Sequence, residues 1–491
     1  MTSQDGFEGV LEREREGALS ALYEGELLQR KGEQLRTLLR EFQALHPDAE
    51  SVRVARAPGR VNLIGEHTDY NGYPVLPMAV DRDILLAFAE GPGVDISNRD
   101  PSYGRRRFSA ELPVDPSARG DWSNYIKAAI SGLLEERVLQ PARFRGLKGL
   151  FDGDIPPSAG LSSSSALLVV TAVALLALHG VETDSLVLAD LLARAERFAG
   201  TEGGGMDQAV SLLGEPGKAL KVEFFPLRVT PVALPEDASV IICHSLVYAS
   251  KSRESRNQYN LRVAECTIAV ALLRRALSQR VRREFQPLRL SDFEKEEGAG
   301  TIEERLRIGR DALGPDPLSL REIGIRLGLS PGEVRDRYCT TRDGTVIQEP
   351  GEGFKIWNRF RHVLSEAKRV EEAAYALGER DVQRFADLMN ESHESCRSDF
   401  EISCPQLDRL VHVARGHGAV GSRLTGAGFG GCTVNIVPRG MVGEFFSGVA
   451  EEYYAREAGD RGLAESAIFP ARAVRGAGLL LEARGSSSAD H

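Results

Sequence analysis

The stretch GRVNLIGEHTDYNGY, from Gly59 to Tyr73, concentrates more polar side chains than an ordinary turn needs. Its charged or strongly polar residues are Arg60, Asn62, Glu66, His67, Asp69 and Asn71. It follows SVRVARA, whose alternation of apolar and polar residues predicts a β-strand. Burying such groups without partners is strongly destabilising. The stretch is therefore either a polar turn at a domain surface or a site that binds a polar ligand.

A second segment, GDIPPSAGLSSSSALLVV (153–170), joins the end of a predicted strand to an apolar helix. Gly160 allows the chain to approach a ligand closely. Serines 162–165 open the helix, so free N–H groups, the helix dipole and several hydroxyls converge on one point. This suits a phosphate chain, but a serine helix cap without a ligand fits equally well. The lysine of a GxxxxGK[ST] loop is missing.

Two more glycine-rich segments occur further along the chain. GSRLTGAGFGGCTVNIV (421–437) has five glycines between Gly421 and Gly431, just before a predicted strand. It is either a tight turn or a loop packed against the phosphate-binding segment or the substrate. GGGMDQ (203–208) places Asp207 at a predicted helix start. Asp207 is either an ordinary N-terminal charge or a carboxylate held in an open site as a base.

Composition excludes several classes of function. The chain has 491 residues and a formal net charge of −10, which argues against a broad nucleic-acid surface. Its six cysteines form no CxxC pair, which indicates buried thiols in a reducing compartment. We see no targeting peptide, and the longest apolar run, ALLVVTAVALLALHG, is too short to span a membrane. We expect a cytoplasmic protein that binds neither nucleic acid nor membranes.

Strands and helices mix without regular βαβ alternation, which predicts the α+β class. We expect a helical N-terminal extension at 1–45, a first domain at 46–230, a second at 231–480 and a disordered tail at 481–491.

The segment LSLREIGIRLGLSPGEVRDRY (318–338) has the pattern of a DNA-binding helix-turn-helix. Seven basic and seven acidic side chains balance across 301–337, which does not suit a phosphate-binding surface. We interpret 283–355 as a helical insertion in the second domain.

Together the segments resemble those of a known kinase family. GRVNLIGEHTDY resembles the galactokinase signature. IPPSAGLSSSSA and LTGAGFGGC resemble the phosphate loop and third motif of the superfamily of galactokinase, homoserine, mevalonate and phosphomevalonate kinases. GTEGGGMDQ and SCPQLDRLV resemble the eukaryotic-type branch of galactokinases and N-acetylgalactosamine kinases. The resemblance implies a two-domain sugar kinase with a mixed-sheet N-terminal domain, an α+β C-terminal domain and the active site in the cleft between them.

The resemblance also implies a sugar site. An epimer is rejected when buried polar groups lose their partners, so a sugar kinase needs many of them. The residues implied to bind the sugar are Arg60, Glu66, His67, Asp69, Gly204, Asp207 and Tyr259. Asp207 matches the family's catalytic aspartate, which accepts or orients the proton of the C1 hydroxyl. Arg60 keeps Asp207 ionised and offsets charge on the phosphoryl group.

The nucleotide site is implied in the same way. Its residues are Ser158, Gly160, Ser162, Ser163, Ser164, Trp122 and Lys251. Trp122 is either a neighbour of adenine or a core tryptophan, and Lys251 either reaches the nucleotide or is solvated. Magnesium bridges the ATP phosphates, and Ser163 and Glu196 are its expected protein ligands.

We therefore expect a monomeric ATP- and magnesium-dependent kinase that makes galactose 1-phosphate. Tyr259 favours galactose over N-acetylgalactosamine, although that sugar and arabinose stay open. A galactose and ATP sensor that binds a transcriptional regulator without turnover is the alternative of another class. The complete GLSSSSA loop, with Arg60 and Asp207, favours the enzyme.

Overall fold

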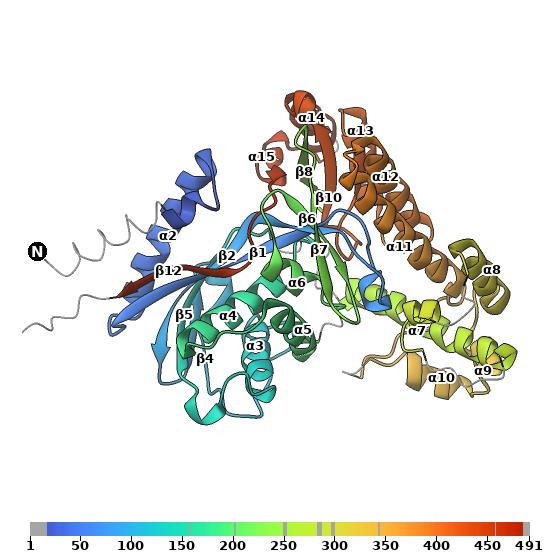
Figure 1. Cartoon of the computed structure of the whole chain (residues 1–491), viewed down its shortest axis with the longest axis horizontal. Helices are drawn as coiled ribbons and strands as arrows, with labels where there is room; N and C mark the ends of the chain where they lie inside the picture. Colours follow the sequence, from blue (N-terminus) through green and yellow to red (C-terminus); the bar gives the residue numbers. More distant parts are fainter. Residues whose placement is uncertain are drawn as a thin grey trace, which may run out of the picture.

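The computed structural model describes the chain in eight stretches (Figure 1). They cover residues 17–156, 159–200, 203–248, 253–281, 287–295, 300–341, 344–456 and 458–484. Within these stretches, no helix is long and apolar enough to cross a membrane.

A six-stranded sheet forms the first half of the fold. Its strands, in order across the sheet, are β12 (Gly478–Arg484), β1 (Ser51–Asn62), β2 (Pro77–Gly91), β5 (Gly146–Gly153), β3 (Val94–Asn98) and β4 (Arg106–Phe108). β3 and β5 run parallel and the other neighbours run antiparallel, so the sheet is mixed, as predicted.

The C-terminal strand corrects the predicted disordered tail. β12 pairs with β1 up to the register Ser51↔Arg484, so residues 481–484 are held by the ladder of the first sheet. Residues 485–491 lie outside the described residues.

The two faces of this sheet carry different helices, because successive side chains of a strand point to opposite sides. Ala55 and Ala57 face a core shared with α3 (Ser123–Glu135), α4 (Ser163–His179), α5 (Ser185–Ala195) and α6 (Met206–Leu213). Val52 and Val54 face α2 (Gly25–Leu45). Over Gly25–Leu45 the extension predicted at 1–45 is helical, and this helix, α2, packs as a layer on the sheet.

A four-stranded antiparallel sheet forms the second half. Its order is β11 (Ile468–Ala471), β8 (Ala238–His244), β10 (Cys432–Pro438) and β9 (Gly421–Leu424). Helices α11 (Ile356–Gly378), α12 (Val382–Ser398), α13 (Pro405–Gly416), α14 (Val442–Val449) and α15 (Ala464–Ala467) surround it.

The predicted boundary at residue 230 does not fall in a linker. It lies inside β7 (Arg228–Ala233), which pairs with β6 (Lys218–Glu223). Ile242 of β8 and Ile436 of β10 belong to the same continuous core as β1, so the two sheets share apolar packing.

Between β8 and α11 the chain forms a helical module, which Figure 1 shows away from both sheets. It contains α7 (Arg253–Val281), a 3₁₀ turn (Leu290–Lys295), α8 (Ile302–Leu313), α9 (Leu320–Leu327) and α10 (Pro331–Tyr338). Capping boxes at Thr301, Ser319 and Ser330 explain why α8, α9 and α10 begin where they do. Their apolar faces pack on α7 and α11.

A buried cluster of charges fastens α2 to the sheet. Asp83 on β2 accepts from Lys31 Nζ at 2.6 Å, from Arg56 Nε at 2.7 Å and from the Tyr23 hydroxyl. Burial alone would raise the pKa of Asp83, but Lys31 and Arg56 outweigh it and hold the pKa well below its usual range. The charge of Asp83 therefore compensates two buried cations.

We predict that Asp83→Asn destabilises the protein by about 3 to 5 kcal/mol, because it removes the carboxylate paired with Arg56 and leaves Lys31 with only the partly exposed Asp154, at 2.9 Å. Urea unfolding measures this change. The matched control is Asp48→Asn, which breaks an ion pair with Lys148 at a 74% exposed aspartate and should change stability by less than about 1 kcal/mol. Equal effects of the two substitutions would contradict the role given to the cluster.

Candidate active site

Three of the glycine-containing segments, 59–73 (the first), 153–170 (the phosphate-binding segment) and 421–437 (the third), meet in the fold. A Cβ added to Gly160 would lie 3.0 Å from the carbonyl oxygen of Thr425, and one added to Gly426 would lie 2.9 Å from the carbonyl oxygen of Gly160. Both glycines have positive φ, +76° and +83°. Backbones approach this closely only where side chains are absent. The predicted packing of the third segment against the phosphate-binding segment is confirmed.

Hydrogen bonds from Thr425 and Gly426 tie the third segment to the first. Thr425 Oγ1 donates to the Asn62 carbonyl at 2.9 Å and accepts from the Asn62 N–H at 3.1 Å. The Gly426 N–H donates to Glu66 Oε1 at 2.8 Å. The end of β1 in the first sheet is thus joined to the loop between β9 and β10 in the second.

Glu66 also forms a buried ion pair. Its Oε2 lies 2.5 Å from Arg423 Nη1 and accepts from Asn62 Nδ2 at 2.9 Å. Burial raises the pKa of Glu66 to about 7, against the opposing effects of Arg423 and the Gly426 N–H. Both carboxylate oxygens of Glu66, implied above to bind sugar, are therefore engaged by the protein.

Sequence reasoning missed Arg423. It is fully buried on β9, and its two guanidinium nitrogens also approach the Leu63 carbonyl and Cys396 Sγ. The signal in the sequence is its position three residues before the glycine-rich loop GAGFGG, because an arginine that is buried beside such a loop must find a partner.

Asp207 and Arg60 face one another. Arg60 Nε donates to Asp207 Oδ1 at 2.8 Å, and the Arg60 guanidinium also donates to the Gly160 carbonyl. Asp207 lies in the first turn of α6, after Gly205 with a φ of +102°. Its side chain is 25% exposed and that of Arg60 is 8% exposed. The pair that the resemblance implied is in contact and has one accessible side.

A second carboxylate lies beside this pair. Glu196 accepts from Ser165 Oγ at 3.0 Å and from Gln208 Nε2 at 2.6 Å. Burial and the charge of Asp207 raise the pKa of Glu196 to about 7. Ser165 Oγ also lies 3.4 Å from Asp207 Oδ2, so this serine bridges the two carboxylates.

Asp69 belongs to the first segment, where it begins the 3₁₀ turn Asp69–Asn71, and it lies close enough to Asp207 for their charges to interact. Its Oδ2 accepts from the Gly204 N–H at 3.0 Å. Burial raises its pKa to about 6, and the charge of Asp207 adds to the effect. A Cβ on Gly204 would lie 2.5 Å from Asp69 Oδ2. Gly204, implied above to bind the sugar, makes room for Asp69 in the structure.

His67 and Tyr259 are neighbours, although they come from different halves of the chain. Their ring centroids are 5.2 Å apart. His67 Nδ1 lies 3.0 Å from the Tyr70 hydroxyl, and Nε2 lies 3.2 Å from the Ala427 carbonyl. Burial lowers the pKa of His67 to about 3, so the ring is neutral and offers hydrogen bonds without charge.

Comparison with known proteins identifies the family of this chain. Three family models match the chain: "Galactokinase galactose-binding signature" at 40–90, "GHMP kinases N terminal domain" at 124–215 and "GHMP kinases C terminal" at 373–455. The galactokinase of Dictyostelium discoideum is 33% identical over 447 residues, covering 84% of this chain and 87% of that protein. The galactokinase of Saccharomyces cerevisiae is 33% identical, covering 85% of this chain and 89% of that one. The chain belongs to the galactokinase family.

Solved structures place this galactokinase-family chain in the expected fold. The crystal structure of Lactococcus lactis galactokinase complexed with galactose superposes with a TM-score of 0.71 at 25% identity, covering 90% of this chain and 99% of that one. A mevalonate kinase structure shares the fold at a TM-score of 0.52 and 18% identity, covering 86% and 99%. The family and fold class predicted from the sequence are confirmed.

The residues implied to bind the nucleotide divide into two groups. Ser163 and Ser164 lie half-exposed in the first turn of α4, beside Gly160 and Ser162. Trp122 is 6% exposed and packs edge-on against Phe151, with ring centroids 5.5 Å apart. The alternative of a core tryptophan is the one the structure favours. Ser158 and Lys251 lie outside the described residues.

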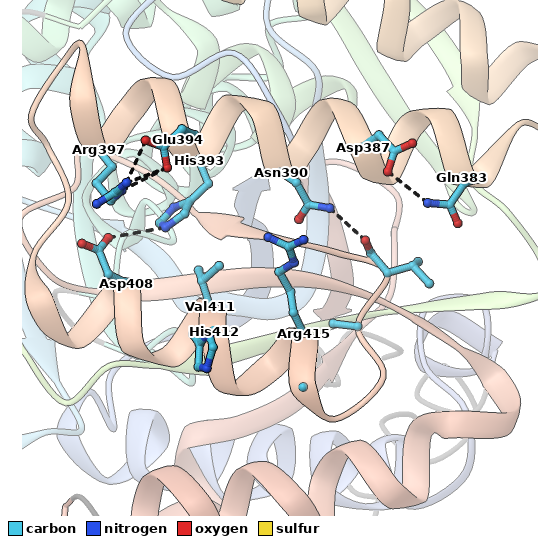
Figure 2. Close-up of a pocket in the computed structure, with 13 residues that line it drawn as sticks. Gln383, Asp387, Asn390, His393, Glu394, Arg397, Asp408, Val411, His412 and Arg415 are labelled. Atoms are coloured by element: carbon cyan, nitrogen blue, oxygen red, sulfur yellow. Dashed lines mark hydrogen bonds and ion pairs between the residues drawn. The ribbon is translucent and has the colours of Figure 1, made fainter.

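A hollow of about 770 Å³ lies elsewhere, between α12 and α13 (Figure 2). Asn390 donates to the Val420 carbonyl across it at 3.0 Å, and Arg415 points into it. Its walls carry acidic and basic side chains, and no residue of the three glycine-rich segments lines it. The hollow is therefore separate from the Arg60–Asp207 pair and the glycine-rich segments around it.

We predict that Arg423→Met destabilises the protein by about 3 to 5 kcal/mol at pH 7.5, because Glu66 keeps a buried charge without its partner. The loss should shrink at pH 5.5. Because burial raises the pKa of Glu66, its carboxyl takes up a proton at a higher pH in the folded state than in the unfolded state. Lowering the pH therefore removes the unpaired charge from the folded variant. Urea unfolding at both pH values, with Arg423→Lys as the charge-retaining control, checks this. A pH-independent loss would contradict it.

Proposed function

We propose that this protein is an ATP-dependent galactokinase, which transfers the γ-phosphoryl group of ATP to the anomeric C1 hydroxyl of galactose. The observation that carries the proposal is the contact of Arg60 with Asp207 beside the phosphate-binding segment, within a chain of the galactokinase family. A carboxylate with one accessible side, an arginine and a helix N-terminus are what phosphoryl transfer to a hydroxyl requires.

Asp207 and Arg60 are the proposed catalytic residues. Asp207 accepts or orients the proton of the C1 hydroxyl, and Arg60 offsets charge that develops on the transferred group. Most of the acceleration comes from positioning and electrostatics, as is usual for phosphoryl transfer.

The proposed sugar ligands are Asp69, the Gly204 backbone, His67 and Tyr259, together with Asp207. Asp69 accepts from the Gly204 N–H, and the neutral ring of His67 lies against the ring of Tyr259. Glu66 supports them through its contacts with Asn62 and Gly426. Buried polar partners of this kind discriminate between epimers, because the wrong hydroxyl leaves them unpaired.

Ser163, Ser164, Gly160 and the free N–H groups of α4 are proposed to hold the phosphates, together with Ser158 and Lys251. Ser163 and Glu196 are the proposed protein ligands of magnesium, and Glu196 would have to give up a hydrogen bond from Ser165 or Gln208 to bind it. In the part of the chain that the structure describes, no three His, Cys, Asp or Glu side chains could hold a metal alone. Mg²⁺ needs only one or two protein ligands when phosphates supply the others. When bound, it neutralises phosphate charge.

We further propose a monomeric cytoplasmic enzyme. All six cysteines are free thiols, which suits a reducing compartment. Galactose is the proposed sugar because Tyr259 lies against His67. N-acetylgalactosamine and arabinose are the competing substrates.

The first test is ADP release with ATP and magnesium, comparing galactose, N-acetylgalactosamine, arabinose and glucose at equal concentration. We expect strong turnover of galactose. Preference for N-acetylgalactosamine would change the proposed substrate but would leave the proposed phosphoryl transfer unchanged. Galactose binding without turnover of any sugar would favour the sensor function.

We predict that Asp207→Asn lowers kcat by about 10²- to 10⁴-fold, because the variant keeps the shape but not the charge of the general base. Calorimetry should still detect galactose binding. The matched control is Asp336→Asn on α10, an exposed aspartate, which should leave kcat unchanged. Full activity of Asp207→Asn would refute the assignment of Asp207.

We predict that Gly204→Ala raises the KM for galactose by about 10- to 100-fold, because the new Cβ displaces Asp69. This is the effect expected when the sugar loses one hydrogen bond to a charged group. Gly203→Ala is the control, since a Cβ there meets nothing within 4 Å. Steady-state kinetics compare the two variants. An unchanged KM for Gly204→Ala would mean that Asp69 does not bind the sugar.

A further inference from the structure

Ser162 immediately precedes α4, but its side chain turns away from that helix. A serine at this position usually accepts a hydrogen bond from an N–H of the first turn. Ser162 makes no such side-chain cap. Its hydroxyl donates instead to Asp207 Oδ2, on a different helix.

The backbone of Ser162 does not favour a serine. Its φ and ψ are 58° and 44°, the left-handed region that glycine adopts freely and other residues adopt at a cost. A glycine would relax this backbone. The serine side chain is therefore not required by the turn, and the hydrogen bond that it forms goes to Asp207.

Asp207 is held at both oxygens. Arg60 Nε donates to Oδ1 at 2.8 Å, and Ser162 donates to Oδ2. Arg60 also donates to the Gly160 carbonyl. The phosphate-binding segment thus touches the Asp207–Arg60 pair twice, once through a main-chain carbonyl and once through the Ser162 hydroxyl.

We propose that Ser162 is a positioning residue for Asp207 rather than a ligand of the nucleotide. It fixes the rotation of the carboxylate, so that the sugar hydroxyl meets Asp207 in one orientation. The inference rests on the proposed kinase function and reassigns Ser162 within it. Ser163 and Ser164, half-exposed on α4, remain for the phosphates.

The test compares Ser162→Gly with Ser162→Ala by steady-state ADP release. Both variants lose the hydroxyl, but glycine relaxes the backbone and alanine keeps it strained. We expect kcat to fall about tenfold or more in both, with little change in the KM for ATP or galactose. Ser162→Asn, which tolerates the left-handed region and carries an amide donor, should recover part of the lost kcat.

Two results would overturn the proposal. Full kcat in Ser162→Gly would mean that the residue only shapes the turn. A raised KM for ATP with kcat intact would mean that the hydroxyl binds the nucleotide.

A second measurement does not depend on turnover. Urea unfolding of Ser162→Ala, Asp207→Ala and the double variant forms a double-mutant cycle. We expect a coupling energy different from zero, and additive effects would remove the contact on which the inference depends. If the wild-type protein phosphorylates no sugar, the proposed function fails, and this cycle still decides whether Ser162 holds Asp207.

Discussion

The buried contact between Glu66 and Arg423 joins the two halves of the site. Glu66 follows β1 in the first sheet, and Arg423 lies on β9 in the second. A buried ion pair adds little to stability compared with apolar packing, but it fixes one arrangement of the groups that form it. The Gly426 N–H donates to the same Glu66, and Gly426 in turn packs closely against Gly160. The ion pair therefore belongs to one continuous set of contacts that reaches the phosphate-binding segment.

Three carboxylates crowd around one arginine, and their surroundings separate them. Asp207 is paired with Arg60 at 2.8 Å. Burial raises the pKa of Asp69 to about 6 and that of Glu196 to about 7. Neighbouring carboxylates that differ in burial and partners are how proteins assign different roles to one type of side chain. The arginine-paired position belongs to Asp207, the residue that we propose faces the reacting hydroxyl.

Much of the fold and site could be predicted from local patterns. The strand before Gly59, the apolar helix after Ser162 and the contact of Arg60 with Asp207 all follow from the segments or from their family resemblance. Three features could not be predicted. The role of α2 depends on Lys31 reaching Asp83 on another element. The placement of Trp122 depends on Phe151, and that of Gly204 on Asp69. Each is a contact between residues far apart in the chain.

The sequence by itself determined the family, the class of fold and the types of residue in the site, because glycines, serines and charged groups at fixed spacing have strong local consequences. Only the tertiary structure decided which polar group each of them meets. A buried carboxylate takes the partner that packing brings within hydrogen-bond distance, so Glu66 met Arg423 and Ser162 met Asp207. Those pairings join segments separated by tens to hundreds of residues, and no local pattern carries that information.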